Sequence, residues 1–171
     1  MTRPELAPRA SASEVLDAAR QAGLSIATAE SLTGGSVCHA LVSVPGASAH
    51  VMGGVVAYDA SAKVRALGVD AEVMAEHGVV SEPTALAMAR GASALLGADV
   101  AVATTGVAGP EPHGGTQVGT VCIGVWGPRE GSAVTLVFPG DRVAVTDAAR
   151  TVALGMLRDR LAEYASGSAV R

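Results

Sequence analysis

The pattern of apolar and polar positions changes period several times along the chain and predicts its secondary structure. Apolar residues at helical spacing, with Ser, Pro and Gly as start and stop signals, predict helices at 11–23, 34–44, 61–67, 70–78, 81–97 and 141–165. Short apolar runs of the kind found in buried strands lie at 24–29, 51–59, 98–106, 117–127 and 133–140. A pair of glycines in the second of these strands predicts a bulge or a close backbone approach.

The order of these elements predicts an α/β fold. Helices and strands alternate through the first two thirds of the chain, and two further strands and a helix follow. This order is typical of a three-layer α/β/α sandwich with a mixed sheet, in which the last two strands are antiparallel neighbours. Without a long linker or an internal repeat, we expect a single domain over residues 1–171, with frayed ends at 1–12 and 166–171.

Composition narrows the classes of function. The chain is 49% hydrophobic but only 2% aromatic, so we expect a core of Ala, Val and Leu, and its net charge of −4 argues against nonspecific binding to nucleic acid or to anionic membranes. An apolar run of about 20 residues, as a membrane span requires, is absent, as is a signal-peptide core. A cytoplasmic enzyme or binding domain is therefore the expectation.

Cysteine and histidine usage indicates neither a metal nor another cofactor. Cys38 and Cys122 lie in apolar contexts, which favours buried free thiols, although a disulfide between them is an open alternative. His113 stands in a loop rich in Pro and Gly, where we expect it to be exposed. No cluster of His, Cys, Asp and Glu has the spacing of metal ligands, so we predict no catalytic metal.

Three loops rich in small and polar residues follow predicted strands: "AESLTGG", "YDASAK" and "TTGVAGPEPHGG". In open α/β sheets, ligands bind where loops leave the carboxyl ends of strands. The three loops are therefore the candidate site, and we expect Thr105, Gly106 and Gly109 of the third loop to shape its pocket.

Ser31, in the first loop, has three possible roles. Local rules favour Ser31 or Thr33 as a cap for the following helix. Gly34 and Gly35 with free helical N–H groups would suit a phosphate cradle, although the GxxxxGK[ST] and GxGxxG fingerprints are both absent. As a nucleophile, Ser31 would need a base. The neighbouring Glu30 could orient the serine loop, bind a ribose hydroxyl or pair with an arginine.

Lys63 is the candidate base. It is the only lysine in a chain with eleven arginines, and a desolvated lysine can become a neutral base, whereas arginine stays protonated. Ser31 and Lys63 follow different strands, so their loops could meet at one edge of the sheet. Tyr58 could relay a proton or orient the amine. The alternatives are a solvated helical lysine and an ordinary surface tyrosine.

Arg142 is the candidate anion-binding residue. In "FPGDR", Asp141 is placed to cap the last helix and Arg142 lies in its first turn. A cation there opposes the helix dipole, a small cost that is understandable if the guanidinium binds an anion such as a phosphate. A solvated arginine is the equal alternative.

The motifs "TAESLTGG", "GGVVAYDASAK", "HGVVSEPTALAMARGA", "TTGVAGPEPHGGTQVGTV" and "FPGDR" together resemble, in this order, the CinA C-terminal-domain family. The resemblance extends from about Glu14 to Tyr164. Stand-alone members of the family are nicotinamide-nucleotide amidohydrolases (PncC). The resemblance implies an α/β sandwich, usually a homodimer, that recycles pyridine nucleotides by hydrolysing nicotinamide mononucleotide to nicotinic acid mononucleotide and ammonia.

The resemblance also implies a metal-independent mechanism with Ser31 as nucleophile, Lys63 as base and Tyr58 as an auxiliary group. The N–H groups of Thr33, Gly34 and Gly35 would then hold the oxyanion. Because the family includes domains fused to larger partners and proteins with competence- or damage-inducible names, a non-catalytic nucleotide-binding or regulatory module is an alternative. An amidase for another small carboxamide is a third possibility.

Two positions depart from the family pattern. Members often carry Cys where this chain has Leu32, for which we expect a packing role. They often carry Ser-Asn where this chain has Asp59 and Ala60. A carboxylate at Asp59 would raise the pKa of Lys63 and make it a poorer base if the two groups approach each other.

Overall fold

The computed structural model describes residues 4–128 and 130–167 of the chain. Its centre is a five-stranded sheet in the order β2-β1-β3-β4-β5. The strands are β1 (Ile26–Glu30), β2 (Val51–Val56), β3 (Val100–Gly106), β4 (Thr120–Trp126) and β5 (Gly131–Val137). The first three are parallel, and β4 is antiparallel to both β3 and β5. The predicted mixed sheet, with its last two strands antiparallel, is confirmed.

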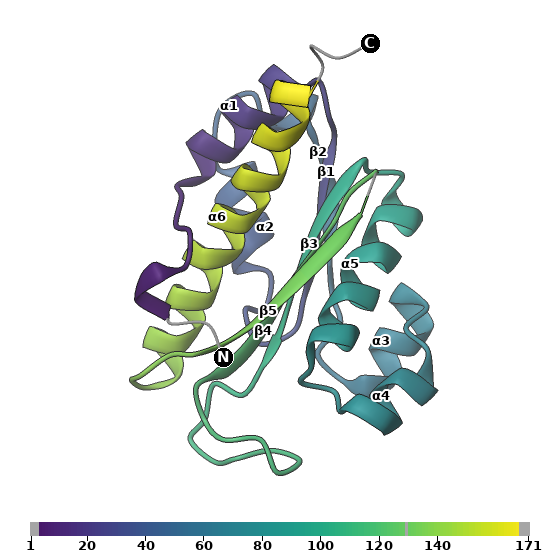
Figure 1. The fold of residues 1–171 in the computed structure, drawn as a ribbon, viewed down its shortest axis with the longest axis vertical. Coiled ribbons are helices and arrows are strands. Elements are labelled where there is room, and N and C mark those ends of the chain that lie inside the picture. The colour runs from purple at the N-terminus through teal and green to yellow at the C-terminus, as the bar shows by residue number, and fades with distance from the viewer. Residues whose placement is uncertain (1–3, 129, 168–171) are drawn as a thin grey trace.

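Helices cover both faces of the sheet (Figure 1). On one face lie α1 (Ala12–Ala22), α2 (Ser36–Val42) and α6 (Arg142–Gly167), and on the other α3 (Ala60–Leu67), α4 (Ala71–His77) and α5 (Glu82–Leu96). Two short 3-10 turns, η1 (Pro4–Leu6) and η2 (Ala47–Ala49), complete the described elements. This is the predicted α/β/α sandwich. No helix in the described ranges has both the length and the apolar character needed to cross a membrane.

Small side chains bring the helices close to the sheet. The core between the sheet and α5 is built mainly from alanines such as Ala27, Ala89 and Ala101, all fully buried. Gly124 of β4 has no room for a side chain, because a Cβ there would lie 2.7 Å from the backbone of Ala85 in α5. A chain with few aromatic residues thus fills its core by close approach rather than by large side chains.

The paired glycines of β2 serve both predicted purposes. The register between β1 and β2 shifts between Ile26 and Ala27, which leaves Met52 as the extra residue of a bulge. At Gly54, a Cβ would lie 2.3 Å from Thr28 Oγ1 on β1, so only glycine fits there.

The N-terminal segment is packed, and its predicted fraying is wrong for the described residues. Ala7 and Ala10 are buried in the core that includes α6. Gly155 of α6 allows this close passage, because a Cβ there would lie 2.3 Å from the carbonyl oxygen of Pro8. At the other end, α6 continues two residues into the stretch that we expected to fray. The first three and last four residues lie outside the described ranges.

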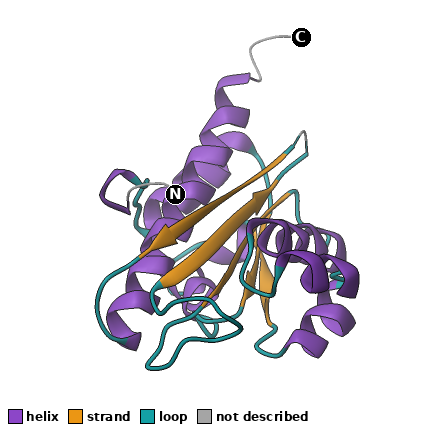
Figure 2. Ribbon diagram, turned by 60° about the horizontal axis from the view of Figure 1, so that its bottom comes forward, coloured by secondary structure: helices purple, strands orange, loops and turns teal. Residues whose placement is uncertain are grey.

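The topology directs three loops to one end of the sheet. The chain passes from β1 to β2 through α2 on one face, and from β2 to β3 through α3, α4 and α5 on the other. The parallel strands β1, β2 and β3 therefore have their carboxyl ends together, at the switch point where ligands bind in such sheets. The long loop between β3 and β4 extends beyond this end (Figure 1), which is turned toward the viewer in Figure 2.

Candidate active site

Ser31 stands at the carboxyl end of β1, in a turn rather than on a helix. Its N–H donates to the Thr104 carbonyl oxygen at 3.0 Å, and its own carbonyl accepts from Gly34 N–H at 3.1 Å. Gly34 and Gly35 have φ of +59° and +98°, a conformation that glycine adopts readily. Helix α2 therefore begins at Ser36, two residues later than predicted. Its N-cap is Gly35, so the interpretation of Ser31 or Thr33 as the cap is wrong.

The carboxylate of Glu30 occupies the start of α2. Its side chain is buried, with the residue only 1% exposed. Its two oxygens accept from the hydroxyls of Thr28 (3.1 Å) and Thr33 (2.8 Å) and from the backbone N–H groups of Gly35 (2.9 Å), Val37 (3.0 Å) and Cys38 (2.8 Å). Of the three roles open for Glu30, the structure supports the orientation of the serine loop. The interpretation as a phosphate cradle is wrong, because a carboxylate of the chain itself fills the place of the phosphate.

At Thr33, Gly34 and Gly35, where we predicted substrate contacts, most of the polar groups already have partners within the chain. Gly34 N–H is bonded to Ser31 and Gly35 N–H to Glu30, so neither is available for an oxyanion. The Thr33 hydroxyl donates to Glu30 and lies 2.7 Å from Thr104 Oγ1. Of the three proposed oxyanion donors, only the Thr33 N–H lacks a partner in the described part of the chain. None of these residues, nor Glu30, lines the cavity described below.

Lys63 faces Ser31 from helix α3. Its Nζ lies 3.1 Å from Ser31 Oγ and donates to the carbonyl oxygens of Ala57 at 2.8 Å and Tyr58 at 3.2 Å. Lys63 is fully buried, so the alternative of a solvated helical lysine is wrong. Asp59 is the N-cap of α3 and so fixes the start of the helix that carries Lys63.

Burial lowers the pKa of Lys63 below its ordinary value of 10.5, because desolvation disfavours the ammonium form. The nearby Asp59 carboxylate acts in the opposite direction, as expected from this departure from the family pattern, but its influence is the smaller of the two. Asp59 is itself engaged by Ser61, whose N–H and hydroxyl donate to it at 2.8 and 2.5 Å.

The partners of Lys63 suit a neutral amine. Carbonyl oxygens can only accept, so those of Ala57 and Tyr58 take the two N–H bonds of a neutral amine. In the neutral form the lone pair faces the Ser31 hydroxyl and can receive its proton without rearrangement. An ammonium form would instead donate its third N–H to Ser31 Oγ, so the lowered pKa, and not these contacts, favours the neutral amine.

Ser31 and Lys63 lie on the wall of a cavity of about 510 Å³. The other predicted residues on this wall are Tyr58, Thr105, Gly106, Gly109 and Arg142. The three loops thus meet, as predicted from their positions after strands, and the start of α6 joins them. A volume of this size is typical of small-molecule sites, for which about 300 to 1,000 Å³ is usual.

The remaining wall residues have clear structural constraints. The Arg142 guanidinium donates to the carbonyl oxygen of Gly109 and so ties the start of α6 to the long loop. Gly106 has no room for a side chain, because a Cβ would lie 2.7 Å from the carbonyl oxygen of Thr120 and 3.1 Å from Leu32 Cδ1. Leu32 is buried, in agreement with the predicted packing role. Thr105 bonds its hydroxyl to the Val79 carbonyl oxygen at 2.9 Å.

Several features of the site were missed from the sequence. The carbonyl oxygens that hold Lys63 belong to every residue type, so no sequence signal could have identified them. Val79, Val80 and Glu111 also line the cavity. Glu111 lies in the loop with His113, where the composition indicated only an irregular segment. Tyr58 was expected to act through its hydroxyl, but its hydrogen bond with Lys63 is through its backbone carbonyl oxygen, and the residue is 67% exposed.

The structure also shows the state of the two cysteines and the placement of possible metal ligands. Cys38 and Cys122 are free, half-buried and buried respectively, in agreement with the predicted free thiols. Across residues 4–128 and 130–167, no group of three or more His, Cys, Asp or Glu side chains is placed to hold a metal ion. His113 is exposed, as expected, and contributes to the cavity wall.

Comparisons with known proteins identify the family. Residues 9–161 match the CinA C-terminal domain. A CinA-like protein of Mycobacterium sp. (strain JLS) is 51% identical over 149 residues, which cover 84% of this chain and 35% of that protein. A CinA-like protein of Chloroherpeton thalassium is 47% identical over 146 residues, covering 81% and 34%. The chain thus spans about a third of the length of these curated relatives.

Solved structures agree with this match. A CinA superfamily protein of Klebsiella pneumoniae superimposes with a TM-score of 0.86 at 36% identity, covering 89% of this chain and 96% of that one. A CinA superfamily protein of Escherichia coli gives a TM-score of 0.80 at 32% identity, with 85% and 87% covered. The chain belongs to the CinA C-terminal domain family.

Proposed function

We propose that this chain is an amidohydrolase that converts nicotinamide mononucleotide to nicotinic acid mononucleotide and ammonia, in pyridine-nucleotide recycling. One observation carries the chemical part of the proposal: the buried Nζ of Lys63 lies 3.1 Å from Ser31 Oγ on the wall of a cavity. A nucleophile within hydrogen-bond reach of its base is the arrangement that covalent catalysis requires. The substrate comes from the resemblance to the amidohydrolases of the family.

In the first half of the proposed reaction, the neutral Lys63 amine accepts the Ser31 proton while Oγ attacks the carboxamide carbon. The tetrahedral intermediate collapses as the C–N bond breaks, and the Lys63 ammonium returns the proton to the departing nitrogen, which leaves as ammonia. The nicotinoyl group is then an ester of Ser31. In the second half, Lys63 deprotonates a water molecule that hydrolyses this ester, and the proton returns to Ser31 as the acid leaves.

Arg142 is the proposed phosphate-binding group. Among the described residues, it is the one arginine on the cavity wall, and its guanidinium has five N–H donors, so the bond to Gly109 leaves donors for a phosphate monoester. Thr105, Gly106 and Gly109 would form the wall along which the rest of the nucleotide lies. Tyr58 is proposed as an auxiliary through its exposed hydroxyl, which Tyr58→Phe removes while the backbone carbonyl that binds Lys63 stays.

Ammonia release from nicotinamide mononucleotide tests the proposal. We expect steady turnover by the wild type and none above background by Ser31→Ala or Lys63→Ala, with acylation trapped as a covalent adduct on Ser31. Full activity of either variant contradicts the mechanism. Saturable binding of the nucleotide without turnover by the wild type instead supports the non-catalytic binding module. Turnover of another small carboxamide alone contradicts the substrate but not the chemistry.

The proposal includes a homodimer, as the family resemblance implies, and a location in the cytoplasm, as expected from the sequence. Light scattering of the purified chain tests the first part: a mass of twice the chain is expected, and a monomer at micromolar concentration contradicts it.

A further inference from the structure

We propose that Glu30 is a positioning residue whose buried carboxylate fixes the turn that presents Ser31 Oγ to Lys63 Nζ. The inference rests on the proposed serine–lysine chemistry, but it concerns a residue that touches neither the cavity nor the reacting atoms.

The carboxylate is held in one orientation. Oε1 accepts from Cys38 N–H, and Oε2 accepts from the N–H groups of Gly35 and Val37. Backbone N–H groups can only donate, so each oxygen must remain an acceptor. The N-cap residue Gly35 provides no side-chain cap of its own. The start of α2 is therefore stabilised by a side chain that comes from outside the helix, five residues before its N-cap.

The same bonds define the serine turn. At its beginning, Ser31 N–H is fixed to the Thr104 carbonyl oxygen on β3. At its end, Gly35 N–H is fixed to Glu30. In its middle, the Thr33 hydroxyl donates to Glu30 and contacts the hydroxyl of Thr104. The turn thus has three attachment points, and two of them are the Glu30 carboxylate.

Glu30 is also connected to the base through its backbone. Its carbonyl oxygen accepts from Ala57 N–H at 2.8 Å, and the Ala57 carbonyl oxygen accepts from Lys63 Nζ at 2.8 Å. Glu30, at the end of a central strand, is therefore bonded both to the turn that carries Ser31 and to the residue whose carbonyl oxygen binds Lys63. A side-chain substitution of Glu30 removes the bonds to the serine turn but leaves the backbone bond to Ala57. It should therefore displace Ser31 while Lys63 stays in place.

Glu30→Gln is the informative substitution. It keeps the shape of the side chain but replaces one acceptor oxygen with an NH₂ group that would face backbone donors. Glu14→Gln is the matched control, because Glu14 also accepts a bond at a helix start, in α1, away from the cavity. Crystal structures of both variants give a readout that does not depend on turnover of any substrate.

We expect the distance from Ser31 Oγ to Lys63 Nζ to increase from 3.1 Å to beyond hydrogen-bond range in Glu30→Gln and to be unchanged in Glu14→Gln. An unchanged distance in Glu30→Gln overturns the inference, whether or not the wild type hydrolyses nicotinamide mononucleotide. If the variant does not fold, Thr33→Val replaces it, with Thr84→Val as its control, because Thr33 belongs to the turn whereas Thr84 is a buried threonine of α5 that bonds the Gly78 carbonyl oxygen. An equal effect of these two substitutions on the Ser31–Lys63 distance then overturns the inference.

Kinetics separate positioning from simple loss of stability. Misplacement of a reacting group by about 1 Å can cost about 10²-fold in rate. We therefore expect kcat of Glu30→Gln, per folded molecule and well below its Tm, to fall about 10²-fold while KM changes less than about threefold. An unchanged kcat per folded molecule in an active enzyme overturns the inference, since a purely structural Glu30 would reduce only the folded fraction.

Discussion

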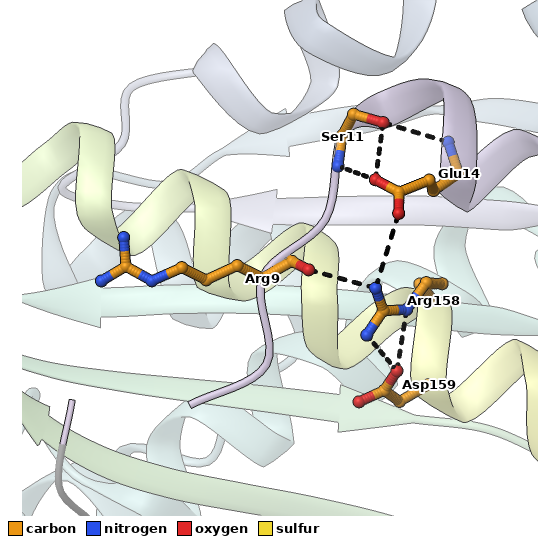
Figure 3. Close-up of polar contacts among 5 residues, drawn as sticks. All are labelled: Arg9, Ser11, Glu14, Arg158 and Asp159. Atoms are coloured by element: carbon orange, nitrogen blue, oxygen red, sulfur yellow. Dashed lines mark hydrogen bonds and ion pairs between the residues drawn. The ribbon is translucent and has the colours of Figure 1, made fainter. Parts of the chain in front are cut away.

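Helices α1 and α2 both begin with help from a glutamate, but the two starts are built differently. At α1, Ser11 Oγ accepts from Glu14 N–H at 3.3 Å, and Glu14 Oε2 accepts from the N–H and hydroxyl of Ser11 at 2.7 and 2.8 Å (Figure 3). Arg158 of α6 lies 3.8 Å from Glu14 Oε1 and donates to the Arg9 carbonyl oxygen at 3.1 Å. The bonds between Ser11 and Glu14 lie at the surface and span only three residues, whereas Arg158 reaches this helix start from α6.

At α2, the glutamate precedes the helix and is buried. The reciprocal bonds between Ser11 and Glu14 satisfy only the backbone at the start of α1, and they can be read directly from the S-x-x-E spacing. Glu30 instead acts across the serine turn, so that the residues between the carboxylate and the helix are free to form the turn that carries Ser31. A helix start can thus be capped from a distance, which leaves the residues next to it free to form a turn that faces a cavity.

The largest loss of activity is expected from substitution of Lys63, which contacts the residue carried by the serine turn. Lys63→Arg places a permanent positive charge at this position and cannot supply a neutral base, because arginine stays protonated. We expect kcat/KM for nicotinamide mononucleotide to fall by about 10³-fold, within the usual range for loss of general acid–base catalysis. Glu14→Gln is the control and should retain wild-type activity. Activity of Lys63→Arg within tenfold of the wild type would mean that Lys63 acts only as a cation.

A difference in stability comes next. Glu30→Ala leaves one buried and two part-buried N–H groups at the start of α2 without their acceptor, and we expect it to lower the free energy of unfolding by about 3 kcal/mol or more. Ser11→Ala removes one exposed cap at α1 and should cost about 1 kcal/mol. Urea denaturation of the two variants measures both losses. Equal losses would contradict the distinction between the two helix starts.

A smaller effect is expected from the proton on Lys63. Its lowered pKa in the folded chain means that, between this pKa and 10.5, the unfolded chain holds a proton that the folded chain has released. Stability should therefore rise with pH across this window through the Lys63 contribution, and it is smallest below the lowered pKa. Urea denaturation at several pH values should give a shallower rise for Lys63→Met than for the wild type. Identical slopes in the two proteins would be evidence against a depressed pKa.

The smallest effect concerns α1. Hydrogen bonds from Ser11, first its N–H and then its hydroxyl, lower the pKa of Glu14 below 4.5, and Arg158 adds to this. The stabilisation is present above the ordinary pKa and is lost as the pH falls through the lowered one. We expect amide exchange in the first turn of α1 to quicken over this range, and Glu14→Gln to show no such pH dependence. Equal acceleration in that variant would assign the effect to another group.

Most of the fold could be predicted because the hydrophobic periods change at clear turn signals. The pairing of Ser31 with Lys63 could also be predicted, since both follow strands whose carboxyl ends must meet and since Lys63 is the only lysine. The packed N-terminal segment was missed because Ala7 and Ala10 carry a weak apolar signal, and the space that receives them depends on a glycine far away, Gly155.

The role of Glu30 could not be predicted for a physical reason. Its donors are spread over residues 28–38 and converge only because Gly34 and Gly35 turn the chain back toward the strand. The expectation that these two glycines hold an oxyanion was wrong for the same reason: their N–H groups are already used within the turn. A sequence shows which amides are near the nucleophile, whereas their direction is set by the folded turn.

The ionisation of Lys63 can be measured directly, without interference from any other lysine. Because Lys63 is the only lysine, a sample with [ε-¹³C]lysine gives a single lysine resonance, and its pH titration reports this group alone. For a buried neutral base, we expect the midpoint of the Lys63 titration to lie clearly below the ordinary pKa of 10.5. A midpoint at or above 10.5 would show that Lys63 is an ordinary ammonium group at neutral pH and would contradict its role as a neutral base for Ser31.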